Sequence, residues 1–482
     1  MSGISLSHGD AGLSHVDRTR SQVFHKRTKG AQLLNKVFSV HSGAGSPLPH
    51  TVGFAIALFI TSTMGGGLIM GVAPFQDALV REFGYEAEDA ALVFGAGFQI
   101  LAVGTAVLAP ALTHLGPRLM ASGGLLLECA GHWIISSIDM LPDKSIGLHL
   151  LMIGYGLVGL GGNLVFVCSL PFSELFANVG VASSIICGGF QAAGFIFMLL
   201  AIVPFVIFFR IYAGMTLIAF FVVFLTYPDH IFEDQDEELR WGVRFSDLPC
   251  IRSRRMSGDD SSAVAKIAQS CRRYVESLRE LRTWLFISVF AWAGTCATWG
   301  AGVFYVVMHN KAQAIPGSQR TEDILTMLMP LLVNSTFVFA PVIGSIVDWR
   351  GFAPPIVAIA VIMCMFCLML WWLPLHLQWL TLITLNVLTA LTYTLQVSYI
   401  AVTYPHAQMG KLMSLTTLCQ SLVNPIAVFL MRCVVRTAVL TFMCPIVPIC
   451  AIWATMQVML RRQGKEFLHR SCFEAGSVHA SF

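Results

Sequence analysis

A glutamate and a histidine stand four residues apart in the middle of an apolar stretch. Glu128 and His132 lie near the centre of the segment 118–138, and an α-helix would place them one turn apart on one face. An ionisable residue at the centre of a bilayer costs at least about 2.5 kcal/mol, which makes it a functional candidate by default. The pair could take up and release a proton, or a neutral Glu128 could hydrogen-bond to His132 or to a neighbouring helix.

Glycines and small polar residues interrupt another apolar stretch at residues 61–67. Three consecutive glycines at membrane depth let a helix unwind only where it lines a cavity, and the freed N–H and C=O groups could bind a carboxylate and an ammonium. The same glycines could equally allow close helix packing. The binding candidates of this stretch are Thr61, Ser62, Gly65, Gly66 and Gly67. In the glycine-rich stretch 154–163, where packing is the simpler interpretation, the binding candidate is Asn163.

Neutral polar side chains also mark the apolar stretches of the second half. Thr295 lies in the stretch 284–307, and Tyr393 and Gln396 lie three residues apart in the stretch 379–402. A buried amide or hydroxyl needs a hydrogen-bond partner, so each of these side chains either binds a substrate or ties two helices together. Ties between helices are the default interpretation.

Several kinds of chemistry have no residues to support them. No Lys or Arg lies deep in an apolar stretch, although Arg normally meets a phosphate or dicarboxylate in a dry site, so strongly anionic substrates are disfavoured. The sequence has no H-E-x-x-H motif, no G-x-S-x-G motif and no paired intramembrane carboxylates, which argues against an enzyme. We expect no cofactor and no metal, and the net charge of +3 implies contact with anionic lipid rather than nucleic acid.

These residues must be held by membrane-spanning helices. The chain is 56% hydrophobic and 12% charged, with a mean hydropathy of +0.71, whereas a soluble domain is about 25% charged. Crossing the hydrocarbon core of a bilayer takes roughly 20 apolar helical residues. Twelve stretches of this kind are present, at 52–74, 90–112, 118–138, 146–170, 180–202, 207–227, 284–307, 324–346, 354–373, 379–402, 411–431 and 437–460.

The hydrophilic interval between the sixth and seventh stretches divides the chain. We predict an all-α membrane protein with twelve transmembrane helices in two six-helix bundles. Its parts are a cytoplasmic tail (1–50), an N-terminal bundle (51–227), a cytoplasmic linker (228–283), a C-terminal bundle (284–460) and a cytoplasmic tail (461–482). Apolar residues at helical spacing predict an amphipathic helix on the membrane surface within the linker, and Ser257 beside two arginines is a candidate for phosphorylation.

Basic residues predict the orientation of the chain. With both termini in the cytoplasm, 23 of the 30 Lys and Arg residues lie at the cytoplasmic face and seven lie outside. Residues 1–49 contain no apolar core, so the first span itself must serve as the signal for insertion. We expect a monomer in the lipid bilayer of the plasma membrane or of an internal membrane, with a small-molecule solute as its partner.

Two short loops indicate that the halves are related. Gly116 and Arg118 follow the second stretch, while Gly344, Asp348 and Gly351 end the eighth. Aligning Gly116 with Gly351 gives an offset of 235 residues, close to the 232 between the starts of the first and seventh stretches. Here the chain resembles the major facilitator superfamily, whose loop between the second and third helices of each half carries G-x-x-x-D-x-x-G-x-R. The resemblance implies a solute transporter that works by alternating access.

Each half keeps part of that loop motif. The first half has Thr113 where the family has the acid, and the second half has Ala353 in place of the final base. In the family this loop clamps the cytoplasmic side while the cavity faces outward, and an Asp in it can accept hydrogen bonds from the N–H groups at a neighbouring helix N-terminus. The simpler alternative is that these residues anchor helix ends at the lipid headgroups. The gating candidates that the resemblance implies are Asp348, Gly351, Gly116 and Arg118.

A second resemblance concerns the substrate. The stretch from Gly159 to Phe197 looks like the fourth and fifth helices of facilitators that carry large neutral amino acids, on the strength of the segments 161–163, 173–176 and 187–193. It implies facilitated diffusion of large neutral amino acids, although Gln191 and Ala193 depart from the commoner side chains of that family. A sugar, nucleoside or monocarboxylate transporter, with or without proton coupling, and a transporter-like solute receptor are the alternatives. The resemblance adds the substrate-site candidates Gly188, Gly189, Phe190 and Gln191.

Overall fold

The chain is helical along most of its described length in the computed structural model, without any strand in the described residues. The structure describes residues 48–66, 71–141, 143–176, 179–228, 274, 278–317, 319–404, 406–432 and 435–463. Within these residues, seven helices are long and apolar enough to cross a membrane, and they are Leu115–Met140, Lys144–Ser173, Val179–Leu200, Phe205–Thr226, Ala353–Trp372, Leu375–Thr403 and Cys444–Arg462. The predicted all-helical membrane fold is therefore confirmed.

The first half begins with a helix that is interrupted in the middle. Its elements are α3 (Leu48–Ile60), the π-helical turn η1 (Thr61–Gly65), α5 (Val72–Phe83), α6 (Ala87–Leu108), η2 (Ala109–Ala111), α7 (Leu112–Ser136), η3 (Ile138–Met140), α8 (Lys144–Ser169), η4 (Leu170–Leu175), α9 (Val179–Ala192), η5 (Ala193–Ala201) and α10 (Phe205–Thr226). The predicted end of the first span at residue 74 is wrong, because α5 continues to Phe83. Pro204 stands directly before α10 and separates the fifth and sixth spans.

The second half repeats this order, with the break moved to its second span. Its elements are α12 (Leu281–Gln313), α13 (Gln319–Asn334), η7 (Ser335–Val338), α14 (Ala340–Arg350), α15 (Ala353–Trp372), η8 (Leu375–Leu377), α16 (Gln378–Thr403), α17 (His406–Arg432) and α18 (Val435–Arg462). Gly67, Ser257, the N-terminal tail, most of the C-terminal tail and most of the linker with its predicted amphipathic helix lie outside the described residues.

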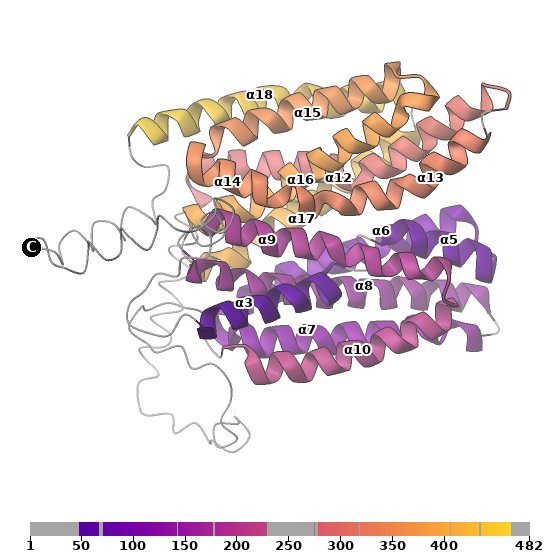
Figure 1. Cartoon of the computed structure of the whole chain (residues 1–482), viewed down its shortest axis with the longest axis horizontal. Helices are drawn as coiled ribbons and strands as arrows, with labels where there is room; N and C mark the ends of the chain where they lie inside the picture. The colour runs from indigo at the N-terminus through magenta and orange to yellow at the C-terminus, as the bar shows by residue number, and fades with distance from the viewer. Residues whose placement is uncertain are drawn as a thin grey trace, which may run out of the picture.

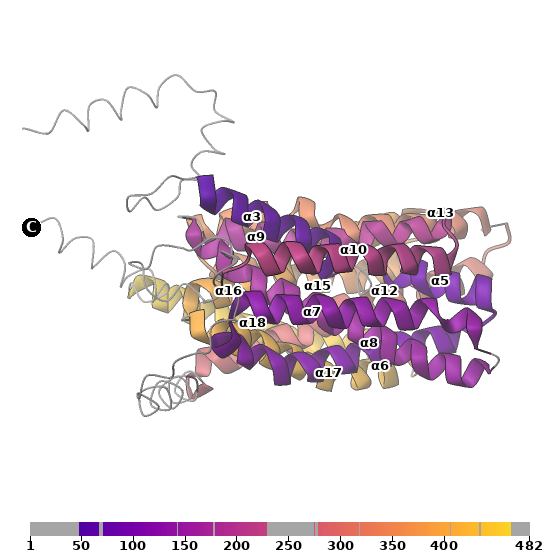
Figure 2. The ribbon, with the colours of Figure 1, turned by 90° about the horizontal axis from the view of Figure 1, so that it is seen from below.

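The two halves lie side by side. In the orientation of Figure 1, helices α3 to α10 form the lower part of the molecule and helices α12 to α18 form the upper part. Helix α9 lies against α14 and α16, and α6 lies against α17, so these five helices form the seam between the halves. Figure 2 shows the same helices running along the long axis of the molecule.

Large apolar side chains cover the outside of the bundle. Val107 is 70% exposed, Ile218 is 65% exposed and Trp372 is 80% exposed. An apolar side chain in such a position costs little only when lipid, not water, surrounds it. This surface is what a membrane protein requires.

The two glycines that align in sequence share a backbone conformation. Gly116 has φ 77° and ψ 165°, and Gly351 has φ 81° and ψ −169°. Both values of φ lie in the region that side chains strongly disfavour, so glycine is needed for the sharp turn that joins the second and third helices of each half. The repeat inferred from the 235-residue offset thus has a structural counterpart.

Candidate functional site

The interrupted first helix packs directly against two neighbouring backbones. A Cβ atom at Gly162 of α8 would lie 2.1 Å from the carbonyl oxygen of Gly65, and a Cβ atom at Gly66 would lie 2.2 Å from that of Phe190 on α9. Only glycine allows such an approach. Of the two interpretations of the glycine run, close packing accounts for both described glycines, Gly65 and Gly66.

The hydroxyl groups beside those glycines have partners within the protein. Thr61 is fully buried, and its Oγ1 donates to Oγ of Ser169 on α8 at 3.0 Å. Oγ of Ser62 donates to the carbonyl of Phe59 at 3.0 Å, one turn earlier in the same helix. Asn163 likewise uses its amide within the first half, where Nδ2 donates to Oγ1 of Thr105 at 3.0 Å. These three polar candidates all make hydrogen bonds that tie or shape helices of the first half.

The α9 candidates Gly188, Gly189 and Phe190 contact residues of both halves. A Cβ atom at Gly188 would lie 3.1 Å from Cα of Phe337 in the second half, whereas one at Gly189 would lie 2.7 Å from Cδ1 of Leu58 in the first half. The ring of Phe190 packs on that of Phe166, with centroids 4.5 Å apart. Each of these residues therefore fills a contact between helices.

Gln191 differs from its neighbours because part of its amide is unused. Its side chain is 1% exposed, and Nε2 donates to Sγ of Cys187 at 3.7 Å. Its Oε1 has no hydrogen-bond partner among the described residues. An unsatisfied buried polar atom costs about 1 to 3 kcal/mol, so this atom is a candidate contact for a bound solute.

Sequence reasoning missed a second buried amide on the opposite side of the seam. Asn334 ends α13 and is 0% exposed, and neither its Nδ2 nor its Oδ1 has a partner among the described residues. Along α9, Gly180 approaches Gly344 and Gly188 approaches Phe337, so α9 runs antiparallel to the segment 334–344. This alignment brings Gln191 and Asn334 to about the same level along the seam. Asn334 was visible in the sequence as a polar residue within an apolar stretch, but nothing in the sequence placed it at the level of Gln191.

The three candidates of the second half use their side chains in hydrogen bonds within that half. Oγ1 of Thr298 and the hydroxyl of Tyr393 lie 2.8 Å apart, and Nε2 of Gln420 reaches them at 2.9 and 3.3 Å. Oγ1 of Thr295 donates to the carbonyl of Ala291 at 2.7 Å. A further tie joins α16 to α17, from Nε2 of Gln396 to Oγ1 of Thr416 at 2.6 Å.

Replacing Tyr393 with phenylalanine should therefore lower stability and leave solute affinity unchanged. The lost hydroxyl leaves Thr298 and Gln420 with one partner fewer, at a cost of about 1 kcal/mol. Thermal unfolding of the purified variant measures the first effect, and equilibrium binding of a transported solute measures the second. A tenfold weaker binding with an unchanged melting temperature would instead identify Tyr393 as a solute contact.

Asp348 joins the two halves at one end of the molecule. Its Oδ2 accepts a hydrogen bond from the backbone N–H of Val181 at 3.1 Å, in the first turn of α9. A Cβ atom at Gly180 would lie 2.6 Å from its Oδ1, so the carboxylate lies flat against the backbone at the start of α9. The first N–H groups of a helix lack partners within it and favour a negative charge. We call this part of the molecule the Asp348 end.

Small residues pack the two halves together around this contact. The hydroxyls of Ser183 and Ser184 on α9 both lie 3.3 Å from that of Ser398 on α16. A Cβ atom at Gly344 of α14 would lie 2.6 Å from the carbonyl oxygen of Gly180. The Asp348 end is therefore closed in this structure.

Arg118 makes different contacts from those of Asp348. Its side chain is 4% exposed, and its Nε donates to the carbonyl of Tyr227 at 2.7 Å. Its backbone N–H donates to the carbonyl of Pro228 at 3.2 Å. These carbonyls follow the C-terminus of α10, where a cation is favourable. The described contacts of Arg118 thus lie within the first half, and Gly116 provides the turn that precedes it.

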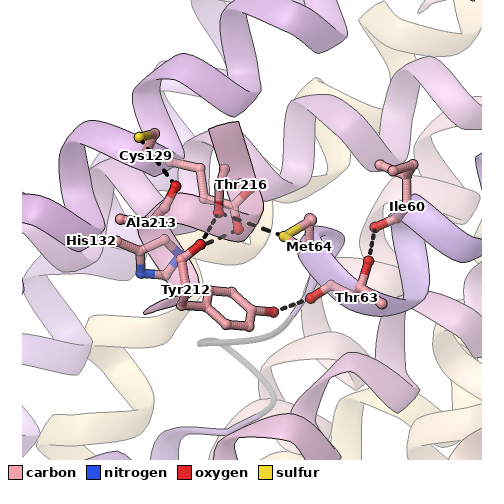
Figure 3. A network of polar contacts seen from close by, with 9 residues as sticks. Ile60, Thr63, Met64, Cys129, His132, Tyr212, Ala213 and Thr216 are labelled. Atoms are coloured by element: carbon pink, nitrogen blue, oxygen red, sulfur yellow. Dashed lines mark hydrogen bonds and ion pairs between the residues drawn. The ribbon is translucent and has the colours of Figure 1, made fainter. Parts of the chain in front are cut away.

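Glu128 and His132 lie within the first half, where Glu128 packs against Gly161 of α8 and His132 packs against α10. Nε2 of His132 lies 3.5 Å from Oε1 of Glu128, and the two side chains are 0% and 1% exposed. The ring of His132 stands edge-on to that of Tyr212, with centroids 4.8 Å apart (Figure 3). The pair that the sequence places on one helical face is thus brought together in the interior of the first half.

Comparisons with solved structures agree on the fold. A variant of the E. coli fucose:proton symporter FucP aligns at 14% identity and TM-score 0.55 and covers 85% of this chain and 99% of that one. FucP in the outward conformation aligns at 12% identity and TM-score 0.54, over 85% and 99% of the two chains. The proton:xylose symporter XylE aligns at 11% identity and TM-score 0.52, over 85% and 95%. At such identities the likeness concerns the fold alone.

Sequence comparison is decisive at the level of the family. No curated protein matches the chain. The model of the Major Facilitator Superfamily, in contrast, matches residues 54–428, which is most of the chain. Together with the two related halves, this match shows that the chain belongs to the major facilitator superfamily.

Proposed function

We propose that this protein moves a neutral or zwitterionic organic solute across a membrane by alternating access, with large neutral amino acids as the first class to test. The observation that carries the proposal is the closed seam at the Asp348 end, where an acid of the second half binds a helix start of the first. Such a contact stabilises one conformation and can break in the other. The two halves then rock about a solute site between them.

The closed end faces the cytoplasm in this proposal, and the cavity opens to the other side. The excess of Lys and Arg in the tails and linker supports that orientation. Asp348 acts as the gate, while Gly351 provides the turn that presents it. Gly116 and Arg118 hold the corresponding loop of the first half to the end of α10 and support the gate only indirectly.

The buried amides of Gln191 and Asn334 are the solute contacts that we favour. They belong to opposite halves, so a solute that bonds to both would be gripped from both sides. Amides donate and accept hydrogen bonds but carry no charge, which suits neutral or zwitterionic solutes. The likeness of the segment 187–193 to amino-acid facilitators supports amino acids, although the same amides could bind the hydroxyls of a sugar. FucP and XylE, described as sugar symporters, share the fold at identities too low to decide.

Counterflow in proteoliposomes tests the proposal without any assumption about driving force. We expect labelled leucine, phenylalanine or tyrosine to enter vesicles preloaded with the same unlabelled solute. Replacing Gln191 or Asn334 with leucine should weaken apparent affinity about tenfold, because each removes one hydrogen bond from a buried site. Gln457→Leu is the control, since its amide donates to Tyr399 at 3.0 Å and ties α18 to α16.

The same assay separates the alternatives. Exchange of fucose, xylose, a nucleoside or a monocarboxylate, with none of any amino acid, would overturn the amino-acid assignment and keep the transporter. Binding of a solute without exchange would identify a receptor with a transporter fold. We further propose that the protein is a monomer in the plasma membrane or an internal membrane. In this proposal it binds no nucleic acid and has no enzymatic activity.

A further inference from the structure

The Glu128 and His132 pair is not something that the fold itself requires. With the 235-residue offset, the corresponding positions of the second half are Met363 on α15 and Cys367, and both are buried apolar residues. The second half therefore folds with apolar side chains at these two positions, and such side chains cost nothing in a membrane. Two ionisable groups have been placed there in one half only, at a substantial cost.

No other charged group compensates the pair within the described residues. Helix α8 approaches Glu128 at Gly161, which cannot titrate. Helix α10 faces it with Phe209 and Tyr212, and on α7 the neighbouring titratable group is Cys129, whose Sγ contacts the carbonyl of Ala213 at 3.5 Å. No atom of the Glu128 carboxyl or the His132 ring has a hydrogen-bond partner among the described residues.

One proton makes this pair neutral as a whole. The proton is either on the Glu128 carboxyl beside a neutral imidazole or on the imidazole beside the carboxylate, and both forms have zero net charge. Removing it leaves a single buried carboxylate, and burying an isolated charge is far more costly than burying a neutral group. The pair can therefore release its proton only in a conformation that gives it water or a new partner.

Tyr212 connects the pair to the interrupted first helix. Its ring contacts His132, and its hydroxyl donates a hydrogen bond to the carbonyl of Thr63 within the π-helical turn η1 (Figure 3). One turn later on α10, Oγ1 of Thr216 donates to Sδ of Met64 at 3.6 Å. Irregular π turns within helices occur often at functional sites. Helix α10 thus touches the pair on one side and the turn on the other.

We propose that Glu128 and His132 form a proton-binding site whose occupancy is linked, through Tyr212, to the shape of the first helix at η1. The pair takes one proton from water on one side of the membrane and releases it to water on the other. Tyr212 is a positioning residue, because its ring holds His132 while its hydroxyl holds Thr63. This inference rests on the proposed transport function, to which it adds a coupled proton.

Solute accumulation under a pH gradient tests the coupling, with leucine or whichever solute of the panel shows counterflow. At one proton per solute, the steady-state concentration ratio in wild-type vesicles should depart from one by about tenfold per pH unit. Glu128→Gln should keep counterflow at equal pH and lose the response to the gradient. Tyr212→Phe, which removes one hydroxyl, should keep counterflow and reduce the response several-fold. Cys129→Ala, one residue from Glu128, is the control and should behave as wild type.

A measurement without solute keeps the two proposals separate. Infrared difference spectra of the purified protein in lipid, recorded during a pH titration, should show a protonated carboxyl stretch that disappears in Glu128→Gln and shifts in Tyr212→Phe. If wild type shows no counterflow but this band titrates, transport is wrong and the proton site stands. If Glu128→Gln responds to the gradient like wild type, or the band is unchanged in that variant, the proton site is wrong.

Discussion

Replacing Asp348 with alanine is expected to open the Asp348 end and to expose the first turn of α9. The variant loses the hydrogen bond to the N–H of Val181 and the favourable interaction of a negative charge with the helix start. Together these contribute about 1 to 2 kcal/mol in a partly buried position. A change of that size shifts the ratio of the two conformations by about 5- to 30-fold.

Hydrogen–deuterium exchange measures this shift without labels. Backbone amides at 179–184 should exchange about 5- to 30-fold faster in Asp348→Ala, because exchange follows the population of the open state. Asp348→Asn should give an intermediate result, since an amide oxygen still accepts a hydrogen bond but carries no charge. Asp139→Ala is the matched control, because Asp139 pairs with Arg210 of the first half at 3.7 Å and has no part in the seam.

The same experiment decides between gating and anchoring. A residue that only anchors α14 at the lipid headgroups would alter exchange near 345–350 and leave α9 protected. Unchanged protection at the start of α9 would therefore rule out the gate. Counterflow adds a second test, because a gate that stays open slows the return to the outward-facing state and lowers the exchange rate.

The sequence predicted those features that depend on local composition. Apolar length was sufficient to predict an all-helical membrane fold, since a bilayer imposes the same requirement on every helix that crosses it. The paired loops were found from glycine, because a turn with positive φ at Gly116 and Gly351 needs that residue in both halves. The break at η1 was also visible, as glycines within an apolar run.

Contacts between distant segments could not be predicted in the same way. Asn334 was not chosen because its interest lies in its level relative to Gln191 of α9, and no periodicity within 324–346 reveals that relation. Tyr212 was one aromatic residue among many in α10, and only the fold places it between His132 and Thr63. Periodicity assigns a residue to a face of its own helix, whereas helix packing decides what lies opposite.

The largest effect on folding is expected from adding a single methyl group to Gly162. Its new Cβ would lie 2.1 Å from the carbonyl oxygen of Gly65 and 2.9 Å from that of Met64. These are backbone atoms, which cannot rotate away as a flexible side chain would. Overpacking of this kind costs about 1 to 3 kcal/mol or more. We expect Gly162→Ala to lose several degrees in melting temperature and much of its yield of folded protein.

A neighbouring helix provides the matched control. Gly123 on α7 has no atom within 4 Å of the position that a Cβ would take, whereas adjacent Gly124 would meet the carbonyl oxygen of Gly161 at 2.8 Å. Gly123→Ala should be neutral or should stabilise α7 by about 0.5 to 1 kcal/mol, because alanine favours a helix. Gly124→Ala should destabilise the protein, as Gly162→Ala does. Thermal unfolding of the three variants in one detergent gives the comparison.

Gly66→Ala then decides what the glycine run does. If the run serves packing, a Cβ at 2.2 Å from the carbonyl oxygen of Phe190 must separate α9 from the first helix, and the variant unfolds at lower temperature than wild type. If the run instead exposes backbone groups to a solute, the variant folds normally and loses only binding. Since α9 also carries Asp348's partner and Gln191, a loss of packing there would disturb both gate and solute site. Lower stability together with a lower counterflow rate is therefore the expected result. Normal stability with lost binding would instead show that the glycine run belongs to the solute site.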